Sequence, residues 1–176
     1  DYEAMKKAGR IVIMGTAGLG DGNVTPVAEF NIWQDAEAAK IVAESGLDHI
    51  IFVGWDACLG DCMLNPAEIK EIRESGELGK FAIDCNKNLL EMNRERFGDD
   101  YLDMADPSAM SAALYPECIE KCEKYYCEVD VSAGPSYGAV LVDVNNVTGK
   151  EPNVYICSKL YADKYKEYIY RTLRVK

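Results

Sequence analysis

A chain of 176 residues is long enough for one domain with a hydrophobic core, and we expect residues 1–176 to form a single domain. Its apolar content of 48% is that of a globular protein, and no apolar run approaches the roughly 18 residues of a membrane span, so we expect no membrane partner. The formal net charge of -11 repels phosphate backbones and argues against a nucleic-acid partner.

Two apolar segments near the N-terminus precede a glycine-rich loop. Residues 2–8 have the pattern of a helix, and residues 11–14 have the pattern of a short buried strand. The glycines within residues 15–22 suggest a dinucleotide-binding loop, but in that motif a helix begins directly after the last glycine. Here Pro26 follows, and no helical periodicity is seen before Asp35, so the dinucleotide interpretation is the weaker one.

Short polar side chains follow this loop. Asn23 and Asn31 each offer a donor and an acceptor, and Glu29 accepts hydrogen bonds through two oxygens. Such a set suits a ligand dense in hydroxyl groups, such as a sugar, and open α/β sheets bind ligands in loops of this kind. Asp35 lies at the expected N-cap of a helix over residues 36–45, so we assign it a structural role first.

The run GNVTPVAEFN from Gly22 to Asn31, followed by DAEAA from Asp35, resembles the ribose-binding segment of the inosine-uridine preferring nucleoside hydrolases. These enzymes hydrolyse the N-glycosidic bond of ribonucleosides. The resemblance implies that Asn23, Glu29 and Asn31 bind the ribose hydroxyls. An ordinary loop with scattered polar residues is the alternative.

A second apolar segment, residues 47–54, has the β-branched composition of another strand. Together with strand 11–14 and the helix between them, it predicts a βαβ unit and hence a parallel sheet. Trp55 follows this strand at the edge expected for the polar side chains. Its ring is suited either to stacking on a nucleobase or to filling the core, and both interpretations stay open.

Seven cysteines cannot all pair, and a chain of this length does not need disulfides for stability. The pairs Cys58 with Cys62 and Cys118 with Cys122 have a spacing that suits zinc, but the chain has only one histidine, His49. Reduced structural thiols in an intracellular protein are the simpler interpretation. No segment resembles a signal or transit peptide, so we expect a cytoplasmic protein.

The middle of the chain predicts helices that serve as scaffold. Asn65 and Pro66 mark the start of a helix over residues 67–75. A longer helix is expected over residues 77–97, which carry apolar side chains on one stripe. Most of the acidic residues lie on the faces of these helices, which is typical of a solvated surface.

The next helix begins near Asp106, which lies at its expected N-cap before a proline. This start is similar to the Asp-Pro-x-Ala segment of nucleoside hydrolases, and the similarity implies that Asp106 ligates calcium. The family has a histidine or a tryptophan just before this aspartate, and that residue acts on the leaving base. This chain has Ala105 there, which can neither protonate the leaving nucleobase nor stack on it, so other residues would have to activate the nucleobase. Tyr101 and Trp55, which join Asn23, Glu29 and Asn31 as candidate substrate-binding residues, are the candidates for this activation, and weak activation is the alternative.

The last part of the chain predicts strands and then a helix. Residues 125–131 and 139–144 flank a turn and predict a β-hairpin, and a strand follows at residues 154–156. The apolar stripe of residues 163–173 predicts a docking helix. The elements together predict an α/β fold, a Rossmann-like open and mostly parallel sheet flanked by helices, with a C-terminal hairpin and docking helix.

The family holds most of its calcium ligands and its aspartate base in an Asp-x-Asp-x-x-x-Asp-Asp cluster after its first strand, and this chain lacks that cluster. We therefore expect an incomplete fold, the C-terminal half of a nucleoside hydrolase domain, which is inactive alone. The catalytic aspartate is expected upstream of Asp1.

With the N-terminal half supplied, the resemblance implies calcium-dependent hydrolysis of ribonucleosides to ribose and free base. It implies calcium as cofactor and a small ribonucleoside as ligand, and the protein is a candidate homo-oligomer. The alternative is a non-catalytic homologue that binds nucleoside or ribose or is purely structural, and Ala105 favours it. A glycosidase with paired carboxylates is a weaker third hypothesis, because no such pair shares a strand end.

Overall fold

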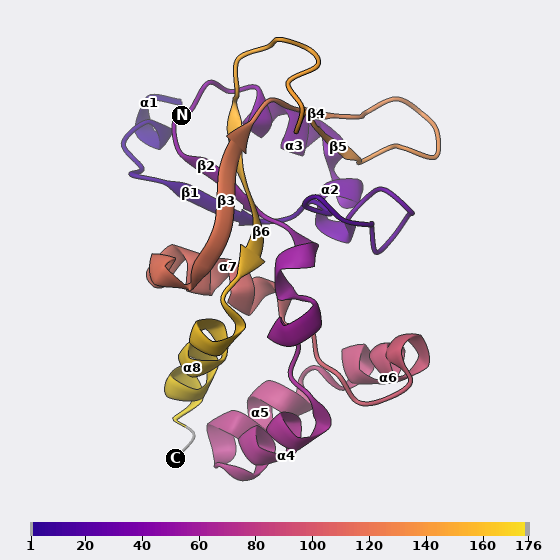
Figure 1. Ribbon diagram of the computed structural model, residues 1–176, viewed down its shortest axis with the longest axis vertical. Coiled ribbons are helices and arrows are strands. Elements are labelled where there is room, and N and C mark those ends of the chain that lie inside the picture. The colour runs from indigo at the N-terminus through magenta and orange to yellow at the C-terminus, as the bar shows by residue number, and fades with distance from the viewer. Residues whose placement is uncertain (1, 175–176) are drawn as a thin grey trace.

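The computed structural model describes residues 2–174, and its centre is a four-stranded sheet. The sheet order is β1 (Ile11–Met14), β2 (Ile50–Val53), β6 (Val154–Leu160) and β3 (Ile119–Tyr125). The first three strands pair in parallel and β3 pairs with β6 antiparallel, as Figure 1 shows. The predicted mostly parallel sheet is therefore confirmed, although the pattern did not reveal β3 as a separate strand.

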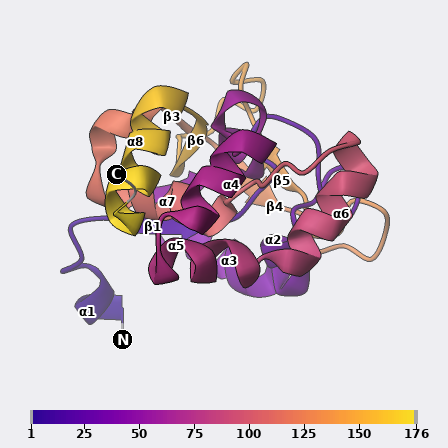
Figure 2. The ribbon, with the colours of Figure 1, turned by 90° about the horizontal axis from the view of Figure 1, so that it is seen from below.

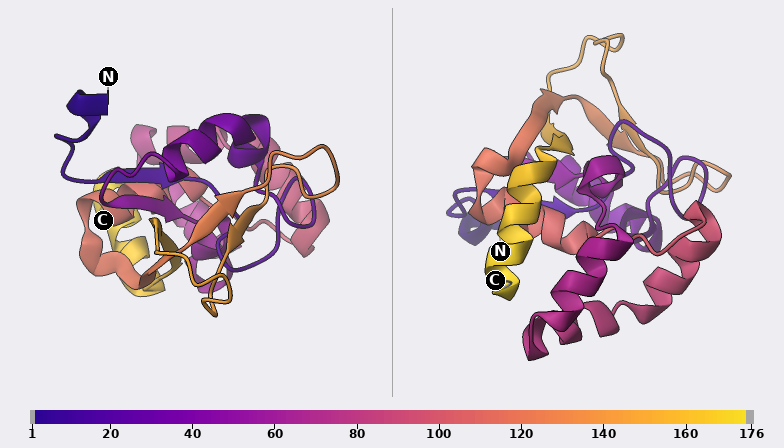
Figure 3. Two further views of the ribbon diagram at one scale, coloured as in Figure 1. Left: turned by 90° about the horizontal axis from the view of Figure 1, so that it is seen from above. Right: turned by 60° about the horizontal axis from the view of Figure 1, so that its bottom comes forward.

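Helices surround this sheet: α1 (Tyr2–Met5), α2 (Phe30–Gln34), α3 (Ala36–Ala43), α4 (Pro66–Glu74), α5 (Glu77–Asp84), α6 (Lys87–Phe97), α7 (Ala105–Leu114) and α8 (Ala162–Leu173). Short 3-10 turns lie at η1 (Trp55–Cys58), η2 (Gly60–Cys62) and η3 (Pro116–Cys118). In Figure 2, α4 lies between α8 and α6, and the right-hand view of Figure 3 agrees. Across residues 2–174, no helix has the length and apolarity that a bilayer crossing needs.

Both faces of the sheet are covered, because side chains alternate along each strand. On one face, Val53 and Leu160 belong to a core that includes Tyr165 of α8 and residues of α4, α5 and α7. On the other face, Phe52 belongs to a core that includes Ala36 of α3 and residues of β4 (Cys127–Val129). This two-sided burial explains the continuous apolar composition of β1 and β2.

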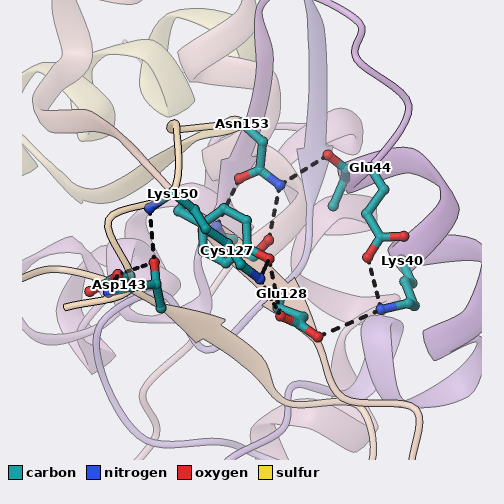
Figure 4. A network of polar contacts seen from close by, with 10 residues as sticks. Lys40, Glu44, Cys127, Glu128, Asp143, Lys150 and Asn153 are labelled. Atoms are coloured by element: carbon teal, nitrogen blue, oxygen red, sulfur yellow. Dashed lines mark hydrogen bonds and ion pairs between the residues drawn. The ribbon is translucent and has the colours of Figure 1, made fainter. Parts of the chain in front are cut away.

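Hydrogen bonds and ion pairs connect the predicted hairpin to the rest of the molecule (Figure 4). The hairpin pairs β4 with β5 (Val140–Val142), in the region expected from the sequence. Asn153 accepts a hydrogen bond from the backbone N–H of Cys127 at 2.7 Å and donates to the carbonyl of Ala43 at 3.1 Å. Its side chain thus joins the hairpin to the end of α3 just before β6 begins.

The predicted helix over residues 77–97 is interrupted in the structure and forms α5 and α6. At the break, the side chain of Asn86 donates to the carbonyl of Ala82 at 2.8 Å, and the backbone N–H of Asn86 bonds instead to Ile83. An asparagine side chain that takes a helix carbonyl from the backbone ends the regular ladder. The predicted N-terminal helix is also shorter, since α1 ends at Met5.

Two of the three predicted helix N-caps are confirmed, and the third is wrong. Asp35 caps α3, accepting from the N–H of Ala38 at 2.9 Å, and Asn65 forms a capping box with Glu68 at the start of α4. The prediction for Asp106 was wrong, because the N-cap of α7 lies two residues earlier, at Met104, and the helix begins at Ala105. Asp106 therefore lies in the first turn of α7.

Candidate active site

The candidate site lies at the carboxyl ends of two parallel strands. Met14 ends β1 and Trp55 follows β2, and both line one cavity of about 390 Å³. The loop between β1 and α2 forms one wall, and the start of α7 forms another. In open α/β sheets, ligands bind outside the carboxyl ends of the strands, so the topology itself favours this cavity.

The structure brings most of the sequence-predicted site residues together here. Asn23, Glu29 and Asn31 line the cavity with Trp55 and Asp106, although Asp106 is 75 residues or more away in the sequence from the loop residues. Tyr101 does not line it within the part of the chain that the structure describes. Its backbone carbonyl accepts a hydrogen bond from Asn93 at 3.0 Å, and a role for its side chain stays a prediction.

Glu29 is held rigidly although it is a carboxylate. It is only 2% exposed and forms the N-cap of α2, accepting from the backbone N–H groups of Asn31 at 3.0 Å and Ile32 at 3.3 Å. Burial raises the pKa of Glu29, and hydrogen bonds from backbone amides, including that of Thr16, partly oppose the rise. The sequence pattern did not reveal α2, whose five residues are too few for a clear helical period.

Asn23 of the loop is oriented by the start of α2, and Asn31, which lies in α2, is oriented by Met14 at the end of β1. Oδ1 of Asn23 accepts from the backbone N–H of Phe30 at 2.8 Å. Nδ2 of Asn31 lies 2.9 Å from the sulfur of Met14 and 3.4 Å from its carbonyl oxygen. Among residues 2–174, these contacts use the oxygen of Asn23 and the nitrogen of Asn31. The Nδ2 donor of Asn23 and the Oδ1 acceptor of Asn31 remain for a ligand.

Trp55 belongs to a buried hydrogen-bonded network. Its indole Nε1 donates to Asp103 at 2.8 Å, and Asn93 of α6 donates to the same carboxylate at 2.5 Å. Asp103 is 5% exposed and Trp55 is 6% exposed, so the indole is mostly covered. The sequence analysis did not single out Asp103, because an aspartate in an irregular segment between two helices has no periodic signal.

The glycine-rich loop contains a strained residue at the site. Thr16 has φ 78 and is fully buried, although a β-branched side chain disfavours this left-handed backbone. Its carbonyl accepts from the backbone N–H of Trp55 at 2.9 Å, and its hydroxyl accepts from the N–H of Gly18 at 3.2 Å. Thr16 thereby joins the exit of β1 to the exit of β2.

A buried carboxylate underlies the same loop. Oδ2 of Asp56 accepts from the N–H of Leu19 at 2.9 Å, and its Oδ1 is buried without a partner among the described residues. A Cβ at Gly18 would overlap this carboxylate, so the glycine allows the close approach. Burial raises the pKa of Asp56 to about 6.

Asp106 is the candidate metal ligand. It is exposed at the cavity wall in the first turn of α7. Its negative charge contributes to the raised pKa of Glu29. A carboxylate oxygen is a ligand that calcium prefers. No group of three or more His, Cys, Asp or Glu side chains suited to a metal is found within residues 2–174, and a role for Asp106 as a metal ligand stays a prediction.

The fold is that of an α/β protein, and the cavity at the carboxyl ends of its parallel strands is lined in part by the polar side chains of Asn23, Glu29 and Asn31. The model of the family described as inosine-uridine preferring nucleoside hydrolase matches residues 1–167, and the chain belongs to this family. The resemblance found in the sequence is confirmed.

Characterised relatives extend this finding. The chain is 34% identical over 153 residues to the pyrimidine-specific ribonucleoside hydrolase RihB of Escherichia coli O1:K1, covering 86% of this chain and 48% of that protein. It resembles the plant nucleoside hydrolase PpNRh1 with a TM-score of 0.87 at 25% identity, covering 100% of this chain and 57% of that one.

A purine-preferring ribonucleoside hydrolase from Gardnerella vaginalis aligns with a TM-score of 0.79 at 27% identity, covering 99% of this chain and 57% of that one. The predicted fold class is confirmed by these likenesses. The chain spans about half the length of the relatives it matches.

Proposed function

We propose that this chain forms the ribose-binding part of a nucleoside hydrolase active site, and that the protein hydrolyses the N-glycosidic bond of ribonucleosides to ribose and free base. The observation that supports this most is that Asn23, Glu29, Asn31 and Asp106 line one cavity. Family membership supports the same reaction.

In this proposal the asparagines and Glu29 bind the ribose. A hydroxyl group both donates and accepts, so it can receive a hydrogen bond from Nδ2 of Asn23 and donate to Oδ1 of Asn31. Backbone amides fix Glu29, and the sulfur of Met14 holds the Asn31 side chain, so less entropy is lost when the sugar binds. A sugar held in one orientation presents its anomeric carbon to an attacking water in a defined geometry.

We further propose that Asp106 is one ligand of a calcium ion, and that residues preceding Asp1 complete the ligand set and supply the aspartate base. Calcium takes six to eight oxygen ligands, and no group of three or more His, Cys, Asp or Glu side chains placed to hold a metal is found within residues 2–174. When bound, the ion would hold ribose hydroxyls and lower the pKa of a water ligand. The chain alone is then expected to bind ribonucleoside without hydrolysing it.

A non-catalytic nucleoside- or ribose-binding homologue is the second candidate. Ala105 favours it, since it lines the cavity and offers no group that acts on the leaving base. The two candidates predict the same ligand but different products. Cytoplasmic localisation and a homo-oligomeric state remain predictions.

The test compares this chain with the longest natural form of the protein. Uridine and inosine are titrated into each by calorimetry, and ribose release is measured by a reducing-sugar assay. Binding by both forms, lost in Asn31→Leu, with ribose release by the longer form only, supports the enzyme. Binding without release by any natural form supports the non-catalytic homologue, and no binding by either form contradicts both.

A further inference from the structure

A second cavity adjoins the cavity lined by Asn23, Glu29 and Asn31, which we call the ribose-side cavity. Its volume is about 580 Å³, and it shares Asn23, Phe30, Trp55, Leu89 and Asp103 with the first. The two cavities are therefore parts of one continuous hollow. A ribonucleoside whose sugar contacts the loop side chains would extend its base into the second part, which α6 borders.

The second cavity has the character of a site for a flat, partly polar ring. Phe30 and Met92 line it with 50% and 64% of their surfaces exposed, so apolar area is available to a ligand. Burying such area against an aromatic base is favourable by about 25 cal/mol per Å². Polar atoms of the base then need partners within the same hollow.

Arg96 is the one lysine or arginine among the described residues that line either cavity. Its guanidinium lies 4.5 Å from the centre of the Trp55 ring. Because Trp55 is fixed by Asp103, this stacking holds Arg96 at the border of the two cavities. No ion pair between Arg96 and a carboxylate is found in the described part of the chain, so its donors are not committed to another charge.

This geometry changes the expectation for Trp55. The arginine covers the indole face and Trp55 is 6% exposed, so a base could stack on Trp55 only after Arg96 moved. Tyr101 lines neither cavity within residues 2–174, and Ala105 carries no polar group. Arg96 is therefore the cationic donor best placed to act on a bound base.

We propose that Arg96 stabilises the departing base, and this inference rests on the proposed hydrolase function. When the bond from the anomeric carbon to the base nitrogen breaks, its electron pair passes to the base, whose carbonyl oxygen becomes negative. The guanidinium donates hydrogen bonds to that oxygen. Water forms the new bond to the anomeric carbon and gives a proton to the proposed aspartate base, which passes it to solvent, and the released nucleobase anion takes a proton from solvent.

Arg96 acts here by charge and not as an acid. An arginine stays protonated at all ordinary pH values, so it cannot deliver a proton to the base. A fixed donor at a place where negative charge develops typically accelerates such a step about 10²–10³-fold. The role therefore depends on how much charge the leaving group develops.

The test uses the longest natural form of the protein and leaving groups of different quality. Arg96→Gln is compared with Arg94→Gln, whose arginine lies on the same helix but pairs with Asp100. We expect Arg96→Gln to lower kcat for uridine by about 10²-fold while p-nitrophenyl riboside, whose leaving group needs no such help, is hydrolysed at the wild-type rate. Arg94→Gln should leave both rates unchanged. Equal losses for both substrates in Arg96→Gln, or no loss for either, would overturn the proposal.

A binding measurement on the present chain separates this proposal from the hydrolase function. The chain has two tryptophans, so Trp33→Phe leaves Trp55 as the only indole reporter. Uracil should change the Trp55 emission, and adding Arg96→Gln should weaken uracil binding without altering ribose binding. If uracil binds the doubly substituted chain as tightly as the Trp33→Phe chain, Arg96 does not contact the base, whether or not the protein is a hydrolase.

Discussion

Trp55 and Asp103, which are 48 residues apart in the sequence, are joined by a buried hydrogen bond of 2.8 Å from the indole nitrogen to the carboxylate. This bond connects the exit of β2 to the segment between α6 and α7. Asn93 donates to the same carboxylate, so three parts of the cavity wall depend on one side chain.

Replacing Asp103 should therefore remove two hydrogen bonds that hold the cavity wall together and destabilise the protein. Asp103→Ala leaves the indole N–H buried without its acceptor, and we expect the free energy of unfolding to fall by about 2 kcal/mol in urea titrations. The Trp55 emission should shift to longer wavelength as water enters. Asp100→Ala is the matched control, since it removes only an exposed ion pair with Arg94 and should change stability by at most about 0.5 kcal/mol. Equal effects of the two substitutions would contradict a special role for Asp103.

Two helix caps allow binding to be separated from stability. Glu29→Ala and Asp35→Ala each remove a side chain that caps a short helix, and each should cost about 1 kcal/mol of stability. Only Glu29 lines the ribose-side cavity. Calorimetry with uridine should then show binding lost in Glu29→Ala and retained in Asp35→Ala. Loss of binding in both variants would mean that α2 and α3 act through stability alone.

The strain at Thr16 predicts an unusual order of stabilities. Thr16→Gly and Thr16→Ala both remove the hydroxyl that accepts from Gly18, but only glycine adopts a φ of 78 without a steric penalty. We expect Thr16→Gly to be more stable than Thr16→Ala by about 1 kcal/mol in thermal or urea unfolding. Alanine as the more stable substitution would show that the left-handed backbone carries no strain.

The buried Asp56 predicts a pH dependence of stability. Its pKa of about 6 in the folded state exceeds the ordinary value of 3.8, so the folded protein binds this proton more tightly than the unfolded chain does. The contribution of protonated Asp56 to the free energy of unfolding is fully present below the pKa of this side chain in the unfolded chain. It is lost as the pH rises through the pKa of the side chain in the folded protein. Relative to Asp56→Asn, the stability of the wild type should fall by up to about 3 kcal/mol between roughly pH 3.5 and pH 7.5. A constant difference between the two proteins would contradict the raised pKa.

The sequence predicted the parts of the fold whose signals are local. Strand 11–14 and the caps at Asp35 and Asn65 were found because apolar runs and capping residues act within a few positions. The break at Asn86 was missed because it depends on a side chain competing for one carbonyl inside an otherwise regular stripe. The first turn of α7 was placed wrongly because the cap preference of aspartate also fits a first-turn position.

The candidate site was found from a long motif, and what was missed depends on distant contacts. The motif predicted that Asn23, Glu29 and Asn31 lie together, and they line one cavity because all three fall within the loop before α2 and its first turn. Arg96 and Asp103 reach the cavity only through the tertiary fold, and neither belongs to a recognisable pattern. Trp55 was assigned to the correct edge, but its cover by Arg96 could not be read from the sequence.

The central proposal, calcium-dependent hydrolysis that uses Asp106, has one direct test. Ribose release from uridine is measured for the longest natural form of the protein, wild type and Asp106→Ala, with added calcium and with a chelator. We predict release by the wild type with calcium, no release with chelator, and at least a 10²-fold loss in Asp106→Ala, as is typical for removal of a group that supports transition-state charge. Release that persists with chelator, or that Asp106→Ala leaves unchanged, would contradict the proposal.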